Sequence, residues 1–248
     1  TTISKKDSLE IASYRTKLSQ YINPIPDSAF FYGRKIKAMA SNLKYGISII
    51  DADYLLGACF KRIQNNDSAL FYFKKSLVLS KKLDYDVGKG RAYNSLGRTY
   101  YLLGMMDSSI TASKKAIASI KEGGKSEEMI IADSHTALAT AYSRKNEMNN
   151  AITHLLKVDS MHQTSPLRPD VIAAAYQNLG NIYLELEEYP SAIEQFRKAN
   201  RQFAKLPEGA SQFYKNTTNV FLGNAYLQTE KIEAADSLLS NSYSYFKK

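Results

Sequence analysis

The chain has 248 residues, of which 44% are hydrophobic and 23% charged, so its composition is that of a folded protein and excludes a disordered one. A single cysteine excludes an internal disulfide and a metal site built from several cysteines. The net charge of +9 raises nucleic acid and anionic membranes as partners, to be judged once the positions of the charges are known.

Helical periodicity and turn residues predict twelve helices along the chain. We expect them at roughly 7–22, 27–44, 48–63, 67–83, 88–103, 107–121, 127–145, 148–162, 169–187, 190–205, 210–229 and 231–246. The expected organisation is a single repeat domain over residues 1–248, with six hairpins at 7–44, 48–83, 88–121, 127–162, 169–205 and 210–246. The longest apolar stretches, such as 54–60, are far shorter than the roughly 18 residues of a membrane span.

Turn chemistry supports these divisions. Each of three Asp-Ser pairs, which begin at Asp27, Asp67 and Asp107, is expected to cap the second helix of its hairpin. Pro190 suits the first turn of a helix. Helix breakers mark the expected joints between hairpins: Gly88 and Gly90, Gly123 and Gly124, Pro166 and Pro169, Pro207 and Gly209.

An internal repeat of about 40 residues is the strongest signal in the sequence. Residues 28–45 align with residues 68–85 without a gap. A leucine followed by a small residue and then an aromatic recurs at Leu56-Gly57-x-x-Phe60, Leu96-Gly97-x-x-Tyr100, Leu138-Ala139-x-x-Tyr142, Leu179-Gly180-x-x-Tyr183 and Leu222-Gly223-x-x-Tyr226. Thirteen residues after each leucine stands Ala or Ser, and four residues further the position is usually large and apolar.

These positions resemble the tetratricopeptide repeat pattern, W-x2-L-G-x2-Y followed by A-x3-F and then P. The resemblance covers nearly the whole chain and is closest to a branch with long repeats, which includes bacterial sensor regions of signalling proteins. Two departures are the missing terminal proline and the leading aromatic position, which holds Asp53, Tyr93, His135, Tyr176 and Asn219. The resemblance implies an all-α, right-handed α-α superhelix, a solenoid of about six hairpins.

In such a solenoid the first helix of each hairpin lines the concave face, which is expected to bind a protein or peptide segment. Amide and guanidinium groups on this face can satisfy a peptide backbone and pair with carboxylates. The residues predicted to bind are Tyr54, Arg91, Asn94, Arg98, Tyr101, Gln177, Asn181 and Asn224. Family members with a basic and asparagine clamp bind peptide termini, but no repeat here reproduces that clamp fully.

Basic pairs recur on the second helices, at Arg34-Lys35, Lys74-Lys75, Lys114-Lys115 and Arg197-Lys198. Evenly spaced cations can follow phosphates, so a nucleic acid or an anionic surface is one alternative partner. The other reading of these pairs, which we prefer, is a solvated outer face. A structural adaptor that dimerises through its terminal helices is a further alternative, and the aromatic end near Tyr243, Tyr245 and Phe246 is expected to be uncovered.

No catalytic, metal or cofactor site is expected. The sequence has no Gly-rich phosphate loop, no G-x-S-x-G and no H-E-x-x-H motif. His135 is expected to pack, His154 and His162 are two helical turns apart and too distant to share a metal, and Cys59 is expected to be buried. Periplasmic and cytoplasmic locations both remain open, with the region tethered to a downstream membrane segment as one arrangement.

Overall fold

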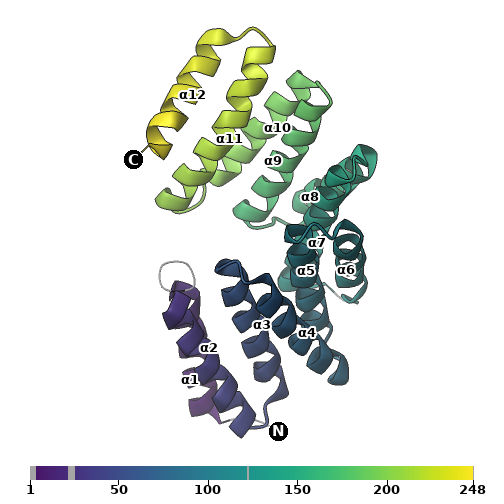
Figure 1. Cartoon of the computed structure of the whole chain (residues 1–248), viewed down its shortest axis with the longest axis vertical. Coiled ribbons are helices and arrows are strands. Elements are labelled where there is room, and N and C mark those ends of the chain that lie inside the picture. The colour runs from purple at the N-terminus through teal and green to yellow at the C-terminus, as the bar shows by residue number, and fades with distance from the viewer. Residues whose placement is uncertain (1–3, 22–25, 122, 248) are drawn as a thin grey trace. The chain divides into compact units, whose positions relative to one another are not determined.

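The computed structural model of the protein describes residues 4–21, 26–121 and 123–247 (Figure 1). Twelve helices are present in these ranges, and no strand. They are α1 (Lys5–Tyr21), α2 (Pro26–Asn42), α3 (Gly46–Arg62), α4 (Asn66–Lys82), α5 (Asp86–Leu102), α6 (Met106–Ala118), α7 (Lys125–Arg144), α8 (Met148–Thr164), α9 (Pro169–Glu185), α10 (Tyr189–Phe203), α11 (Glu208–Gln228) and α12 (Ile232–Phe246). Each predicted helix is confirmed within a few residues at its ends. Residue 22, the predicted end of the first helix, lies outside the described ranges.

The chain divides into two compact units, residues 1–137 and 138–248, and the boundary falls within α7. In the first unit, α1 packs on α2, α3 on α4, and α5 on α6. In the second unit, α9 packs on α10 and α11 on α12, which Figure 1 shows as adjacent antiparallel pairs. The first helices of consecutive hairpins also touch, α3 with α5 and α9 with α11.

The turn inside each hairpin has the same backbone design in five repeats. The residue eight positions after the landmark leucine has a positive φ, and the next backbone N–H donates to the carbonyl of the landmark aromatic. These residues with positive φ are Gln64, Gly104, Asn146, Glu187 and Glu230. Such a left-handed residue with a reaching-back hydrogen bond is the usual way to end a helix, and only Gly104 adopts it without steric cost.

Because each second helix begins directly after this turn, the predicted caps are displaced. The cap of α4 is Asn65, whose side chain accepts a hydrogen bond from the Ser68 N–H at 3.0 Å. Asp67 and Asp107 lie inside the first turns of α4 and α6 instead, so their prediction as caps is wrong. A carboxylate in the first turn still interacts favourably with the positive end of the helix dipole.

The glycine of the landmark pair permits close packing within each hairpin, as its pattern predicts. A Cβ on Gly57 would lie 2.7 Å from the Phe73 ring, and a Cβ on Gly180 would lie 2.6 Å from the Phe196 ring. Phe73 and Phe196 are fully buried, each within a hydrophobic core cluster of its unit. The repeated small and large positions are therefore facing sides of one helix–helix contact.

Gly88 and Gly90 do not separate two hairpins, contrary to the prediction. Both lie within α5, and both are buried. A Cβ on Gly90 would approach the Ile120 side chain to 2.7 Å, so glycine is present there for a close approach and not to end a helix.

Candidate functional site

Five of the predicted binding residues, Tyr54, Arg91, Asn94, Arg98 and Tyr101, belong to the first unit. They lie on α3 and α5, the two first helices that contact each other. We call this surface the α3–α5 face. Its residues differ in availability, because some are already engaged by neighbouring side chains.

Arg91 is held by the protein itself. Its Nη1 lies 3.0 Å from Asp51 Oδ1, and its guanidinium group lies 4.4 Å from the centre of the Tyr54 ring. Arg15 on α1 pairs with the other oxygen of the same carboxylate, at 3.2 Å. The buried Asp51 thus connects three successive hairpins. Because Arg91 is engaged in this ion pair, it has a structural role and is less available to a ligand.

Arg98 is exposed, and a partly buried lysine shares its surroundings. The pKa of Lys61 is lowered to about 8, mainly by burial and also by the positive charge of Arg98, while the negative charge of Asp133 opposes the shift. The two cations repel each other, so an anion placed near them would be favoured. Lys61 lies on the same predicted helical face as Tyr54 but is not among the predicted binding residues. Its position seven residues after Tyr54, two turns along one face of the helix, could have identified it.

Asn94 is the most buried of the five predicted residues on the α3–α5 face, with an exposed fraction of 7%. No donor among the described residues reaches its Oδ1. A buried acceptor of this kind costs free energy unless it receives a hydrogen bond. Asn94 therefore carries a buried acceptor that an additional hydrogen bond would stabilise.

The other three predicted residues, Gln177, Asn181 and Asn224, belong to the second unit. They lie on α9 and α11, which also contact each other. The buried Oδ1 of Asn181 is likewise without a donor among the described residues, while Asn224 is exposed. The eight predicted residues thus form two sets, one for each unit.

The basic pairs of the second helices are largely placed over aromatic rings. Lys35 lies over Phe31 at 5.4 Å and Lys75 over Phe71 at 5.1 Å from the ring centres. Arg197 donates two hydrogen bonds to the Tyr226 hydroxyl, at 2.7 and 3.1 Å. Cation–π contacts of this kind contribute about 0.5–1 kcal/mol at exposed sites, which gives several of these cations a structural role.

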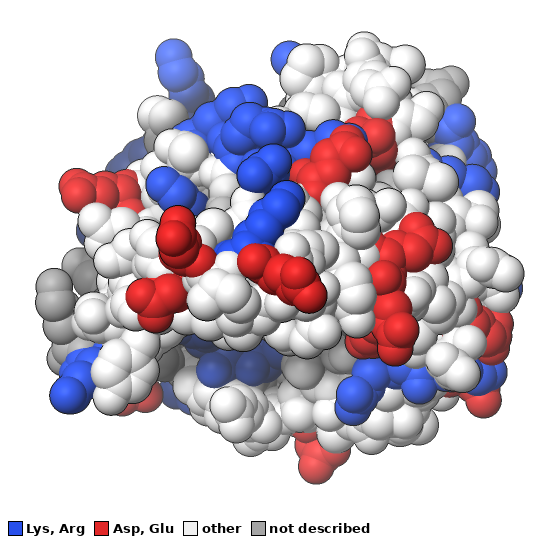
Figure 2. Space-filling view, turned by 90° about the horizontal axis from the view of Figure 1, so that it is seen from above, with Lys and Arg blue, Asp and Glu red and all other residues white. Residues whose placement is uncertain are grey.

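Lys and Arg side chains nevertheless gather on part of the surface. On the face drawn in Figure 2 several of them lie together near the upper middle and others lie separately toward the edges, with Asp and Glu side chains between them. Such a mixed surface has local positive potential without being uniformly basic.

The histidines and the cysteine serve packing. His135 and Cys59 are buried, and burial raises the pKa of the Cys59 thiol to about 11. His154 stacks on Tyr142 at 5.6 Å, and His162 Nδ1 accepts the Leu167 N–H at 3.0 Å. A search of the described ranges found no group of three or more potential metal ligands from His, Cys, Asp and Glu. Nor is any helix in those ranges long and apolar enough to cross a membrane.

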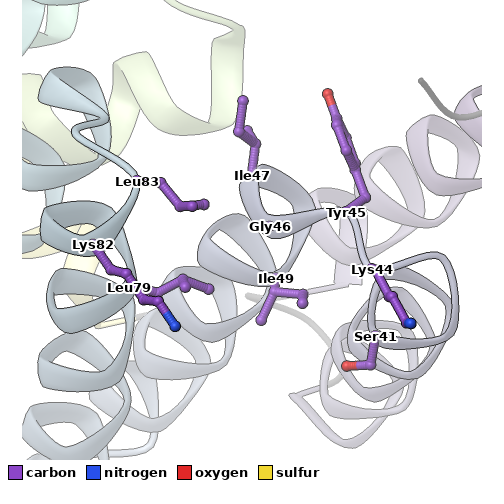
Figure 3. A pocket seen from close by; sticks show the side chains of 9 residues that line it. All are labelled: Ser41, Lys44, Tyr45, Gly46, Ile47, Ile49, Leu79, Lys82 and Leu83. Atoms are coloured by element: carbon purple, nitrogen blue, oxygen red, sulfur yellow. The ribbon is translucent and has the colours of Figure 1, made fainter. Parts of the chain in front are cut away.

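A cavity of about 540 Å³ lies between the α2–α3 joint and the C-terminal end of α4 (Figure 3). Figure 3 shows the side chains of Ile49, Leu79 and Leu83 around it, with Lys44 from the α2–α3 joint and Lys82 from α4. Its lining is mainly apolar, so it lacks the converging polar groups that orient a ligand. The α3–α5 face has them.

These features define an all-α helical repeat protein with a polar face on its first helices. The tetratricopeptide repeat family model matches residues 90–121 and 173–202, which are the hairpins α5–α6 and α9–α10. The chain therefore contains tetratricopeptide repeats, and its fold is the all-α superhelical repeat fold of the proteins that carry them. No curated protein sequence matches the chain significantly.

Solved structures with this fold include bacterial proteins. BtubC from P. vanneervenii is 16% identical, with a TM-score of 0.69 over 97% of this chain and 91% of that chain. The apo form of RapI is 16% identical, with a TM-score of 0.67 over 96% of this chain and 65% of RapI. NprR in complex with its cognate peptide NprX is 14% identical, with a TM-score of 0.67 over 100% of this chain and 69% of NprR.

Proposed function

We propose that the chain is a non-catalytic scaffold whose α3–α5 face binds an extended protein or peptide segment carrying a carboxylate. The observation that carries the proposal is the buried Asn94 acceptor on the same helix as the exposed Arg98, with Lys61 in the same electrostatic environment. The fold is shared with NprR, which has been solved with a peptide, and this supports a peptide as the ligand. The input region of a bacterial signalling protein is the setting that we propose for this face.

The chemistry of the three residues is complementary to an extended peptide. Asn94 Oδ1 accepts a backbone N–H, which an extended segment presents at every second residue on one side. Arg98 and Lys61 attract a carboxylate from a side chain or a C-terminus, and Arg98 can hold both oxygens. Asp133 reduces the net positive charge, so we expect a single carboxylate and not an acidic run.

The first test is binding of a peptide library by the wild-type chain, followed by Arg98→Ala. Losing one charge-assisted hydrogen bond costs about 1.5–3 kcal/mol, so we expect the selected peptide to bind roughly 10- to 150-fold more weakly. Fluorescence polarisation would measure the affinity and circular dichroism the helix content. Arg34→Ala, which removes another exposed arginine from α2, is the matched control and should leave the affinity unchanged. Equal affinity of the wild type and Arg98→Ala would disprove the role of this face.

A second expected result is a loss of affinity at alkaline pH. The pKa of Lys61 is about 8 in the free protein, so its amine becomes neutral as the pH rises through that value and no longer attracts a carboxylate. Affinity for an acidic peptide should therefore fall between pH 7 and pH 9. Lys61→Arg, whose charge persists over this range, should flatten the profile. An unchanged pH profile in Lys61→Arg would show that Lys61 does not contact the ligand.

The adaptor alternative has one supporting observation. Tyr243 and Phe246 at the end of α12 are exposed, whereas Tyr245 is partly buried and its ring contacts that of Phe246. Analytical ultracentrifugation of wild type and of a Tyr243→Ser, Phe246→Ser variant would test it, because dimerisation through this end requires the variant to be monomeric.

A further inference from the structure

A second pocket lies on a different side of α5. It has a volume of about 490 Å³ and is lined by residues of α4, α5 and α6. Its apolar floor includes Leu77, Leu96 and Ala112, all of them buried. The size and the apolar floor are those of a site for a small molecule.

Three lysines from two helices surround this pocket: Lys74 and Lys81 on α4, and Lys115 on α6. The ammonium groups of Lys81 and Lys115 lie 5.5 and 6.0 Å from the centre of the same Tyr93 ring. Asp107 is the carboxylate among the lining residues, so three positive charges face one negative charge. Among the described residues, no carboxylate forms an ion pair with any of the three lysines.

The other repeats show how such cations are balanced elsewhere. One repeat earlier the position of Tyr93 is occupied by Asp53, which pairs with Lys37 at 2.5 Å. Two repeats later it is Tyr176, whose hydroxyl donates to Asp159 at 2.5 Å, with Lys198 over the ring at 5.7 Å. Each of these two grooves thus contains an acidic side chain as well as a lysine. The groove between α4 and α6 holds three lysines, and among the described residues no acid pairs with them or with the Tyr93 hydroxyl.

We propose that this pocket binds a small phosphorylated compound, with its phosphate between the ammonium groups and a ring or apolar portion against Tyr93 and the apolar floor. A phosphate dianion balances the excess of positive charge better than a single carboxylate does, and lysine binds phosphate as a point charge. Tyr93 and Tyr100 supply aromatic surface for a ring. The binding is independent of the peptide site, because Asn94 and Arg98 lie on another face of α5.

The test uses isothermal titration calorimetry of the full chain with AMP, CMP and phenyl phosphate, and with adenosine and inorganic phosphate as the separated parts. We expect at least one phosphorylated ring compound to bind with a Kd below roughly 1 mM and about tenfold more tightly than either part. Lys81→Gln and Lys115→Gln should each weaken it about tenfold, and added salt should weaken it as well.

Lys75→Gln is the matched control. Lys75 is also exposed on α4, but its ammonium group lies over Phe71 and it does not line the pocket, so this variant should bind as the wild type does. Arg98→Ala should also bind the compound normally, which separates this site from the peptide site. Failure of all three ring phosphates below roughly 1 mM, equal binding of adenosine, or equal weakening by Lys75→Gln would each overturn the proposal.

Discussion

Phe196→Ala is expected to lower the free energy of unfolding by about 3–5 kcal/mol, one of the two largest effects of a single substitution in this chain. The Phe196 side chain is fully buried, faces Gly180 across the α9–α10 contact, and stacks on Phe221 of α11 at 6.0 Å between ring centres. Its removal leaves a cavity that three packed helices cannot close without moving apart. Urea unfolding followed by circular dichroism would measure the change.

Phe213→Ala is the control for this result. Phe213 lies on α11 of the same unit, but about half of it is exposed, so the same substitution should cost about 1 kcal/mol or less. Similar losses of unfolding free energy for both variants would mean that the burial of Phe196 is not the cause of its effect.

Lys37→Met should destabilise the first unit by a comparable amount, about 3–5 kcal/mol. Asp53 has an exposed fraction of only 4%, and among the described residues its carboxylate is partnered by Lys37 alone, at 2.5 Å. Methionine retains most of the aliphatic stem and removes the charge, so Asp53 remains buried without a counterion. Thermal and urea unfolding would both detect the loss.

Two further variants distinguish charge burial from lost packing. Combining Lys37→Met with Asp53→Leu removes both charges and should recover much of the stability, because a buried pair can often be replaced by apolar residues. Lys121→Met, in the same unit, removes an exposed cation 3.5 Å from Asp86, which keeps Lys89 as its partner, and should cost no more than about 1 kcal/mol. If the double variant is no more stable than Lys37→Met, the unpaired carboxylate is not the cause.

The helix pattern could be read from the sequence because the constraint is local and repeated. The landmark positions around Leu56, Leu96 and Leu179 recur with nearly constant spacing, and each requires a small residue opposite a large one. The helix ends were less accurate. Asp67 has the chemistry of a cap, but the turn at the left-handed residue Gln64 places the cap of α4 at Asn65, two positions earlier. Glutamine, unlike glycine and asparagine, carries no sequence signal for the left-handed conformation.

The sequence by itself determined the repeat, the twelve helices and the polar character of the predicted binding face, because these depend on spacing within one hairpin. Only the tertiary structure decided which polar groups are available. Arg91 and Asp51 are 40 residues apart and pair across α3 and α5, so of the two arginines predicted to bind only Arg98 is exposed. The lowered pKa of Lys61 and the lysine pocket around Tyr93 arise in the same way, because burial and charge contacts are made between helices that the sequence separates.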